Sequence, residues 1–223
     1  MSKSKVVVAK DLYLGYKNEM IIEKGNFSLQ SGDFVFLTGA SGSGKTTLIR
    51  SLYGEIKPKS GYLNIGGFDM MNISHSKLTY LRRYLGVVFQ DYKLINEWNI
   101  EKNVKLPLMI AGINEDMQNK KASKLLSQVK LAHRADKYPY ELSGGEQQRA
   151  AVIRAIINEP VLILADEPTG NLDDYSAKLV MDLFRYANEL GITILIATHH
   201  LPQSFDIPYR HIKIEGKKIY EVS

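Results

Sequence analysis

Two stretches of the chain combine glycines with hydroxyl-bearing and charged residues at spacings that suit phosphate chemistry. Residues 39–46 read Gly-Ala-Ser-Gly-Ser-Gly-Lys-Thr, and residues 142–149 read Leu-Ser-Gly-Gly-Glu-Gln-Gln-Arg. Glycines in the first stretch allow successive backbone N–H groups to turn toward phosphate oxygens, and a following helix adds its positive N-terminal end. Lys45 is expected to reach the β- and γ-phosphates, and Thr46 to offer its hydroxyl to Mg²⁺.

The first stretch therefore predicts a nucleotide site with ATP and Mg²⁺ as cofactors. With glycine near 7% of average composition, it would arise by chance in roughly one chain in a hundred, and the second stretch in roughly a few in a hundred thousand. Besides Lys45 and Thr46, the expected nucleotide contacts in and after this loop are Gly39, Ser41, Gly42, Ser43, Gly44 and Thr47.

Two carboxylates follow a strongly apolar run. Residues 161–165 are Val-Leu-Ile-Leu-Ala, and Asp166 and Glu167 come directly after them. Such a pair alone is more often solvated surface. The run, however, predicts a strand buried on both faces, and ligands of open α/β sheets bind at the carboxyl ends of strands. We expect Asp166 to hold the metal through water and Glu167 to polarise the attacking water.

The elements that must position these residues read as a parallel α/β core. Residues 34–38 predict a strand before the glycine-rich loop, and residues 45–53 a helix after it. Residues 161–165 and 193–197 predict further buried strands. The segment 174–190 between them predicts a helix, with Leu179, Leu183, Tyr186 and Leu190 at helical spacing, Asp173 or Asp174 as its N-cap and Gly191 as its C-cap. This order indicates a doubly wound fold.

The remaining segments predict two peripheral pieces of a single domain, 1–223. Shorter, half-exposed strands at 6–14, 27–30 and 62–65, with a hairpin around residues 215–217, suggest a small antiparallel sheet. Residues 91–142 predict an inserted helical lobe, with Asn114 capping a helix at 115–129 and breaks at Pro107 and Pro139. Residues 1–90 and 143–223 would form the core with the antiparallel sheet.

Composition narrows the class of protein. The chain has 223 residues, 44% hydrophobic and 24% charged, as in globular proteins. It has no cysteine, which excludes disulfides and thiolate zinc sites and suits a reducing cytoplasm. The longest apolar runs have strand length, so another chain would have to span any membrane. A net charge of +5 suggests a solvated surface or, alternatively, attraction to anionic lipid. The scattered lysines do not suggest nucleic-acid binding.

The motifs, in this order and spacing, resemble the ATP-binding cassette (ABC) ATPases along essentially the whole chain. They are the glycine-rich loop, Gln90 within Gly-Val-Val-Phe-Gln-Asp at 86–91, the Leu-Ser-Gly-Gly-Glu signature, Asp166-Glu167, Asn171-Leu172-Asp173, and His199. The resemblance implies that ATP binding closes a head-to-tail homodimer. In that dimer Ser143, Gly144 and Gly145 of one copy would complete the γ-phosphate site of the other.

The same resemblance implies roles for single residues. Gln90 would contact Mg²⁺ or the attacking water and link the two lobes, His199 would sense the γ-phosphate, and Asp173 would contact the opposed subunit. His200 stands where the family usually has aspartate. An aromatic residue about two dozen residues before the loop commonly stacks on adenine; Tyr16 is best placed and Tyr13 competes, with packing of the small sheet as the other explanation.

Within the family, Ala-Asp-Glu-Pro-Thr-Gly-Asn-Leu-Asp at 165–173 resembles a branch whose membrane partners do mechanical work. Residues 36–39, 81–83, 86–91 and 197–199 favour its cell-division members, which control cell-wall hydrolysis. The alternatives are a lipoprotein-release or macrolide-efflux ATPase or, less favoured, a soluble ATPase acting on nucleic acid or ribosomes.

The favoured reading implies a peripheral subunit on the cytoplasmic face of the bacterial plasma membrane. It would bind an integral membrane partner through a groove near Leu94, Ile95 and Trp98, unless these residues pack inside the lobe.

Overall fold

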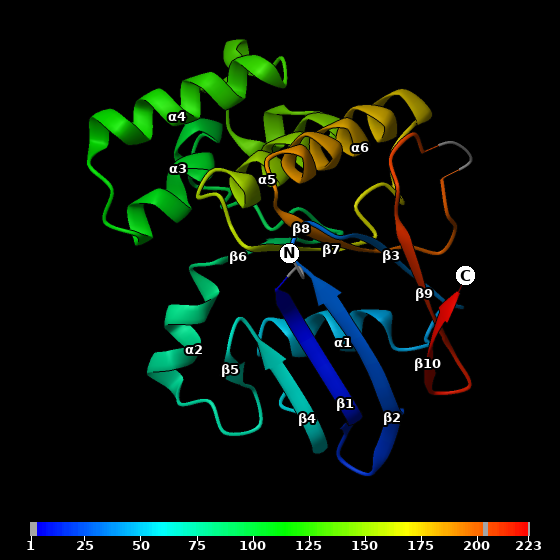
Figure 1. Ribbon diagram of the computed structural model, residues 1–223. Helices are drawn as coiled ribbons and strands as arrows, with labels where there is room; N and C mark the ends of the chain where they lie inside the picture. Colours follow the sequence, from blue (N-terminus) through cyan, green and yellow to red (C-terminus); the bar gives the residue numbers. More distant parts are fainter. Residues whose placement is uncertain (1–3, 203–204, 223) are drawn as a thin grey trace.

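Two β-sheets and one helical layer organise the chain. Figure 1 shows the computed structural model, which describes residues 4–202 and 205–222. Helix α1 (Lys45–Leu52) lies between the sheets, and its Leu48, Ile49 and Leu52 are buried against both. The opposite face of the larger sheet is covered by α5 (Gly144–Ile156) and α6 (Asp174–Glu189).

The larger sheet has the strand order β10-β9-β3-β8-β7-β6. All neighbouring pairs in it are parallel except β10 with β9. Every residue of β3 and β8 is buried, as expected of strands covered on both faces. The prediction of a mostly parallel α/β core is confirmed. The strands are β3 (Phe34–Thr38), β6 (Leu85–Val88), β7 (Leu162–Asp166), β8 (Thr193–Ala197), β9 (Arg210–Glu215) and β10 (Lys218–Val222).

The C-terminal hairpin, β9 and β10, belongs to this larger sheet, so its assignment to the small antiparallel sheet is wrong. Strand β9 pairs in parallel with β3, with Leu37 opposite Ile212. Arg210 at the start of β9 donates a hydrogen bond of 2.6 Å to Asp33, the residue before β3. A short strand with alternating burial can join either sheet. Which sheet it joins depends on its pairing partner, which is distant in the sequence and cannot be identified from the local pattern.

The smaller sheet is antiparallel, as predicted, with the order β2-β1-β4-β5. Its first two strands each have 12 residues and are interrupted by register shifts, so they are longer than the sequence pattern indicates. The strands are β1 (Lys5–Tyr16), β2 (Glu19–Gln30), β4 (Ser60–Ile65) and β5 (Phe68–Asp69).

The predicted helical segment forms a lobe with its own core, built from α3, α4, the following 3₁₀ turns and one side of α5. Asn114 caps α4 as predicted, through a bond from the Met117 N–H. The elements are α3 (Ile100–Ile110), α4 (Glu115–Gln128) and 3₁₀ helices at Ala132–Arg134 and Pro139–Glu141; a further helix, α2 (His75–Arg82), precedes β6.

Pro107 does not break a helix. It lies inside α3, which ends only at Ile110, just before the left-handed Gly112. An interior proline costs about 3 kcal/mol relative to alanine. Burial of Ile100, Val104 and Leu108 in the core of the lobe offsets this cost. Pro139, in contrast, begins a short 3₁₀ helix.

Helix α6 buries a different stripe from the one expected. Its N-cap is Asp173, one of the two residues predicted for that position. Its C-cap is Leu190, and the left-handed Gly191, predicted as the C-cap, comes one residue later. The fully buried face consists of Val180, Phe184 and Ala187. The expected stripe lies beside it: it is half-buried where α6 approaches the lobe, and Leu190 is exposed. Two apolar stripes one residue apart have the same period, so periodicity alone cannot rank them.

Candidate active site

The glycine-rich loop joins β3 to α1 with little free space around it. A Cβ atom on Gly39 would lie 2.5 Å from Ser43 Oγ and 2.7 Å from the Ile214 carbonyl oxygen. Gly44, which directly precedes α1, has a φ of 108° that side-chain-bearing residues rarely adopt. These requirements explain why this loop needs glycine at both positions, and they direct the start of α1 toward the ligand site.

Three of the predicted catalytic residues meet at the carboxyl edge of the sheet. Lys45 is only 5% exposed, and its ammonium donates to the Gly39 carbonyl oxygen at 2.9 Å. The same Nζ lies 3.6 Å from Glu167 Oε1 and 3.4 Å from His199 Nδ1. His199 Nε2 lies 3.0 Å from Glu167 Oε1. The three side chains come from α1 and from the ends of β7 and β8, which are neighbours in the sheet.

The backbone of Glu167 turns sharply at the end of β7. Its φ is 50°, in the left-handed region that is uncommon for a residue with a side chain. Its N–H donates to the Ala197 carbonyl oxygen at 2.9 Å, which ties the turn to the end of β8. Such strained backbone is often found at functional sites. Here it accompanies a carboxylate that faces the lysine of the loop.

Asp166 and its neighbours fit a magnesium ion. Asp166 Oδ1 is buried and has no hydrogen-bond partner among the described residues. Burial raises the pKa of this carboxyl, against smaller opposing effects of the Thr46 hydroxyl and the Lys45 ammonium. A buried carboxylate oxygen of this kind is suited to a cation. Thr46, Gln90 and Asp166 line one cavity of about 700 Å³.

The protein ligands are too few to enclose the metal. In the described part of the chain, no group of three or more His, Cys, Asp or Glu side chains is placed to hold an ion. Magnesium is usually held by one or two carboxylates together with substrate phosphates and water. The site therefore fits Mg²⁺ that arrives with a nucleotide.

A cavity of about 360 Å³ brings together six of the residues predicted to bind nucleotide, all in or just after the loop, with three of the predicted catalytic residues. Gly39, Ser43 and Tyr16 do not line it; Gly39 and Ser43 lie close to each other in the loop itself. Its lining consists of Ile21, Ser41, Gly42, Gly44, Lys45, Thr46, Thr47, Gln90, Glu167 and His199.

The signature lies away from this cavity. None of residues 142–149, all of which the structure describes, lines it. Ser143 caps α5: its hydroxyl accepts from the Glu146 N–H at 3.3 Å, and its own N–H donates to the Glu146 carboxylate at 2.9 Å. The exposed Ser143 thus stands at a helix N-terminus whose partial positive charge can attract an anion from outside this chain.

Tyr16, rather than Tyr13, reaches the loop region. Its hydroxyl is 3.5 Å from Thr47 Oγ1, and the side chain is 45% exposed. Tyr13 lies opposite Ser60 of β4. The position of Tyr16 is suited to stacking on a base whose phosphates lie in the loop.

Asp173 caps a helix in the single chain, and His200 lies apart from His199. Asp173 accepts a hydrogen bond from the Ser176 N–H at 2.9 Å as the cap of α6, and that bond holds its pKa below the usual value. His200 lines a different cavity from His199, on the side of α6. The two histidines therefore do not converge on one ligand.

Other residues near the site carry weaker sequence signals. Arg50 and Asn171 line the cavity of Asp166 and Gln90. Arg154 is buried within α5 and contacts the segment after Gln90. Asn171 belongs to the Asn-Leu-Asp motif at 171–173, and Arg154 is a charged residue within the otherwise apolar run 150–157, whereas Arg50 has no comparable signal.

Comparison with known proteins agrees with this geometry. The family model described as ABC transporter matches residues 22–170. The chain belongs to the ABC transporter family. As an ABC ATPase it binds and hydrolyses ATP, which confirms the predicted family and enzyme class.

Two relatives of this ABC ATPase, from different bacteria, carry the same name. It is 39% identical over 215 residues to "Cell division ATP-binding protein FtsE" of Streptococcus pneumoniae D39, covering 96% of this chain and 94% of the relative. It is 40% identical over 189 residues to the protein of that name from Escherichia coli K12, covering 85% and 84%. The predicted similarity to the cell-division branch is confirmed.

Solved ABC cassettes share the fold. A dimeric post-hydrolysis state of the ATP-binding cassette MJ0796 bound to ADP and phosphate has a TM-score of 0.86 and 31% identity, covering 97% of each chain. Among the described residues, no helix of this ABC ATPase combines the length and the apolar character needed to cross a bilayer.

Proposed function

We propose that this ABC ATPase is the nucleotide-hydrolysing subunit of a cell-division complex at the bacterial plasma membrane. The observation that carries the proposal is the similarity to FtsE proteins, 39% to 40% identical over most of their length. The subunit would bind peripherally, on the cytoplasmic face, to an integral membrane protein like FtsX. Closure of two copies of the subunit when ATP binds would then act, through that membrane partner, on cell-wall hydrolysis at the division site.

Each residue of the site has a proposed part in hydrolysis. Lys45 exchanges its bond to the Gly39 carbonyl for phosphate oxygens, and backbone N–H groups of the loop bind the rest of the phosphate chain. Glu167 accepts a hydrogen bond from the attacking water and orients it, while His199, 3.0 Å from that carboxylate, binds the γ-phosphate. Tyr16 stacks on the adenine.

Thr46, Asp166 and Gln90 are the residues proposed to hold Mg²⁺, with Asp166 acting through water. Bound magnesium supplies positive charge to the β- and γ-phosphate oxygens. The support from this chain is the buried Asp166 oxygen without a hydrogen-bond partner among the described residues, at the edge of the cavity that Thr46 and Gln90 share.

Two copies are needed to complete the site. No residue of the signature, all of which the structure describes, lines the phosphate cavity of its own chain, although Ser143 is exposed at the N-terminus of α5. We propose a head-to-tail homodimer in which Ser143, Gly144 and Gly145 bind the γ-phosphate held by the partner's loop. The exposed Asp173 would then lie between the subunits.

Ser143→Arg tests this arrangement. The substitution is expected to leave ATP affinity of the monomer within about twofold, because the residue does not line its own cavity, and to lower ATP hydrolysis by about a hundredfold or more, as loss of a transition-state anion contact does. Titration with a fluorescent nucleotide and a phosphate-release assay measure the two effects. A large loss of affinity in the monomer would mean that the signature acts within its own chain.

The membrane partner is proposed to bind a groove of about 450 Å³ between α2, β6 and α3. Leu106, Pro107 and the exposed Ile110 of α3 line it together with Arg82 and Arg83 at the end of α2. Among the described residues that line the groove, none is acidic. A short amphipathic segment with an acidic residue would match this surface.

Leu94, Ile95 and Trp98 do not line this groove. Leu94 packs on the core of the helical lobe, and Ile95 exchanges two hydrogen bonds with the Asn103 side chain. The Trp98 ring lies 4.2 Å from the Lys102 ammonium. These contacts favour internal packing for this apolar cluster, so the docking surface is assigned to the neighbouring groove.

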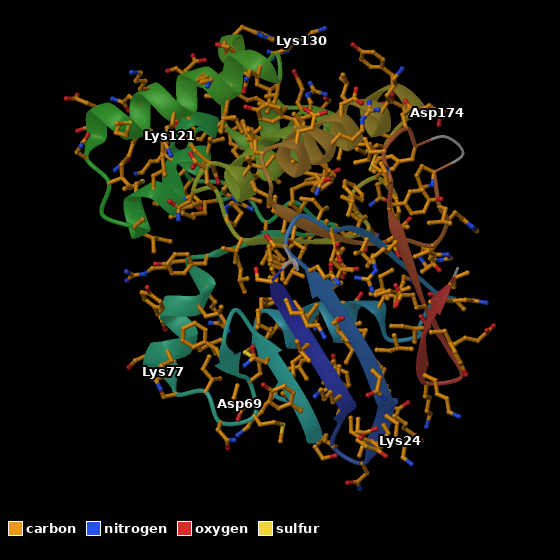
Figure 2. All side chains as sticks on the ribbon, in the orientation of Figure 1. Lys24, Asp69, Lys77, Lys121, Lys130 and Asp174 are labelled. Carbon is orange, nitrogen blue, oxygen red and sulfur yellow. The ribbon has the colours of Figure 1, made fainter. Side chains whose placement is uncertain are left out.

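Lysines are spread over separate parts of the surface. Figure 2 labels Lys24 on β2, Lys77 on α2, and Lys121 on α4, far apart on the molecule. A nucleic-acid site usually gathers its basic residues on one face. The proposal therefore favours a membrane partner over nucleic acid or ribosomes.

A chromosomal replacement tests the proposed cellular role. Cells in which Glu167→Gln replaces the wild-type residue are expected to grow as chains or filaments with unseparated septa, because the variant would hold ATP without turnover. Outer-membrane lipoproteins, where the organism has them, should stay correctly placed. Microscopy and membrane fractionation give the two readouts. Normal septation with misplaced lipoproteins would support the lipoprotein-release alternative instead.

A further inference from the structure

Arg154 is a buried charge that the proposed reaction does not use. It lies on α5 and is 8% exposed. Its Nη1 donates to the Lys93 carbonyl oxygen and its Nη2 to the Tyr92 carbonyl oxygen, both at 2.7 Å. Burial lowers its pKa to about 10. Arginine is almost never buried without a partner, and here two successive backbone carbonyls take that place.

The segment that Arg154 holds has an unusual backbone. Tyr92 and Lys93 have φ values of 62° and 48°, so two successive residues with side chains lie in the left-handed region. Such conformations persist only where the surroundings stabilise them. The planar fork of a guanidinium can donate to two acceptors at once, which suits this pair of carbonyls. The segment begins two residues after Gln90.

The same segment touches the other end of α5. A Cβ atom on Gly144 would lie 2.9 Å from the Tyr92 hydroxyl, so the tyrosine ring extends to the first residue of the helix. The main chain of Tyr92 is thus fixed near the C-terminal part of α5, and its side chain ends beside the signature. Gln90 itself lines the phosphate cavity.

We propose that Arg154 is a positioning residue that couples Gln90 to the signature end of α5. The inference rests on the role proposed above for Gln90 at the γ-phosphate. A displacement of Gln90 on ATP binding would pass through residues 91–93 to α5, because the two hydrogen bonds join that segment to a rigid helix. Without Arg154 the segment can relax, and the signature loses its link to the occupancy of the phosphate site.

Arg154→Met and Arg154→Lys test the inference in the full-length protein. The methionine variant is expected to keep ATP affinity of the monomer within about twofold, because Arg154 does not touch the cavity, while kcat falls about tenfold or more, in keeping with the loss of charge-assisted hydrogen bonds. KM for ATP should change less than kcat. When Arg154→Met is combined with Glu167→Gln, the protein concentration at which ATP produces half-maximal dimer should be about tenfold higher than for Glu167→Gln alone. The lysine variant keeps the positive charge but not the planar fork that donates to both carbonyls. Its kcat and its dimerisation should lie between those of Arg154→Met and the wild type.

The variant Gln90→Ala separates the proposed role of Gln90 at the γ-phosphate from the proposed role of Arg154. If Gln90 and Arg154 act through one segment, each variant lowers kcat, and the double variant is no slower than the slower single one. A Gln90→Ala enzyme with wild-type kcat would overturn both the role of Gln90 and this inference.

Three results would overturn the role of Arg154 alone. The first is wild-type kcat and dimerisation for Arg154→Met, together with an impaired Gln90→Ala. The second is a loss of monomer ATP affinity as large as the loss of kcat. The third is failure of both Arg154 variants to fold by circular dichroism, which would assign the residue to folding.

Discussion

Glu167→Gln is expected to abolish steady-state ATP hydrolysis while ATP binding is retained or strengthened. A positioned general base contributes about 10²- to 10⁴-fold to a rate. Glutamine keeps the size of the side chain and can still bond to His199, which lies 3.0 Å from the present carboxylate. It removes a negative charge 3.6 Å from Lys45, where the γ-phosphate is proposed to bind, so repulsion between carboxylate and nucleotide falls.

Size-exclusion chromatography with ATP and Mg²⁺ should show a stable dimer of this variant, and a phosphate-release assay should show at least a hundredfold slower turnover. Glu189→Gln, at the exposed end of α6, is a control with the same chemical change far from the site. Turnover at the wild-type rate by Glu167→Gln, or failure of that variant to bind ATP, would refute the role assigned to Glu167.

Lys45→Ala is expected to remove useful ATP binding. The ammonium is the one charge that the loop itself offers to the phosphates, and hydrogen bonds to charged groups contribute about 1.5–3 kcal/mol each. Loss of more than one such bond lowers the affinity for ATP by about a hundredfold or more. Titration with a fluorescent nucleotide measures the affinity. Hydrolysis and ATP-driven dimerisation should be lost with it.

Lys120→Ala, at an exposed position of α4, provides the matched control because it also removes one lysine charge. The melting temperature separates binding from folding, since Lys45 is buried and bonded to the Gly39 carbonyl in the free protein. A folded Lys45→Ala variant with wild-type affinity would show that the phosphates bind elsewhere.

Lys45 and Glu167 could both be singled out from the sequence, because the features that mark them lie in a few consecutive residues. The loop between β3 and α1 depends on glycines whose backbone angles or close contacts admit no side chain, and those requirements fall on neighbouring residues. Asp166 is the last residue of a strand that is buried on both faces, and Glu167 follows it, so their place at the carboxyl edge is set by the strand itself. Helix caps such as Asn114 and Asp173 are equally local.

The pairing of distant segments could not be derived in this way. Strand β9 was expected in the antiparallel sheet, yet it pairs with β3, because pairing depends on which buried edge is available once the core has packed. The sequences of β6 and α2 have no strong hydrophobic periodicity. The family motif around Gln90 indicates a function for that residue, but it does not predict that the residues before it form a strand. In α6, two apolar stripes have the same period, and only the packing of the helix against the rest of the chain determines which of them is buried.

The sequence by itself determined the family, through the order and spacing of its motifs. It also determined the glycine-rich loop, the place of two carboxylates at the carboxyl edge of the sheet, and the parallel core, because each of these depends on the conformation or burial of a few consecutive residues. Only the tertiary structure decided that Lys45, Glu167 and His199 meet within hydrogen-bonding or ion-pair distance, that the signature lies outside its own phosphate cavity, and that Arg154 bonds to the carbonyls of residues 92 and 93. These contacts of Lys45 and of Arg154 join residues more than sixty positions apart, and their geometry follows from how sheet and helices pack rather than from any local preference of the chain.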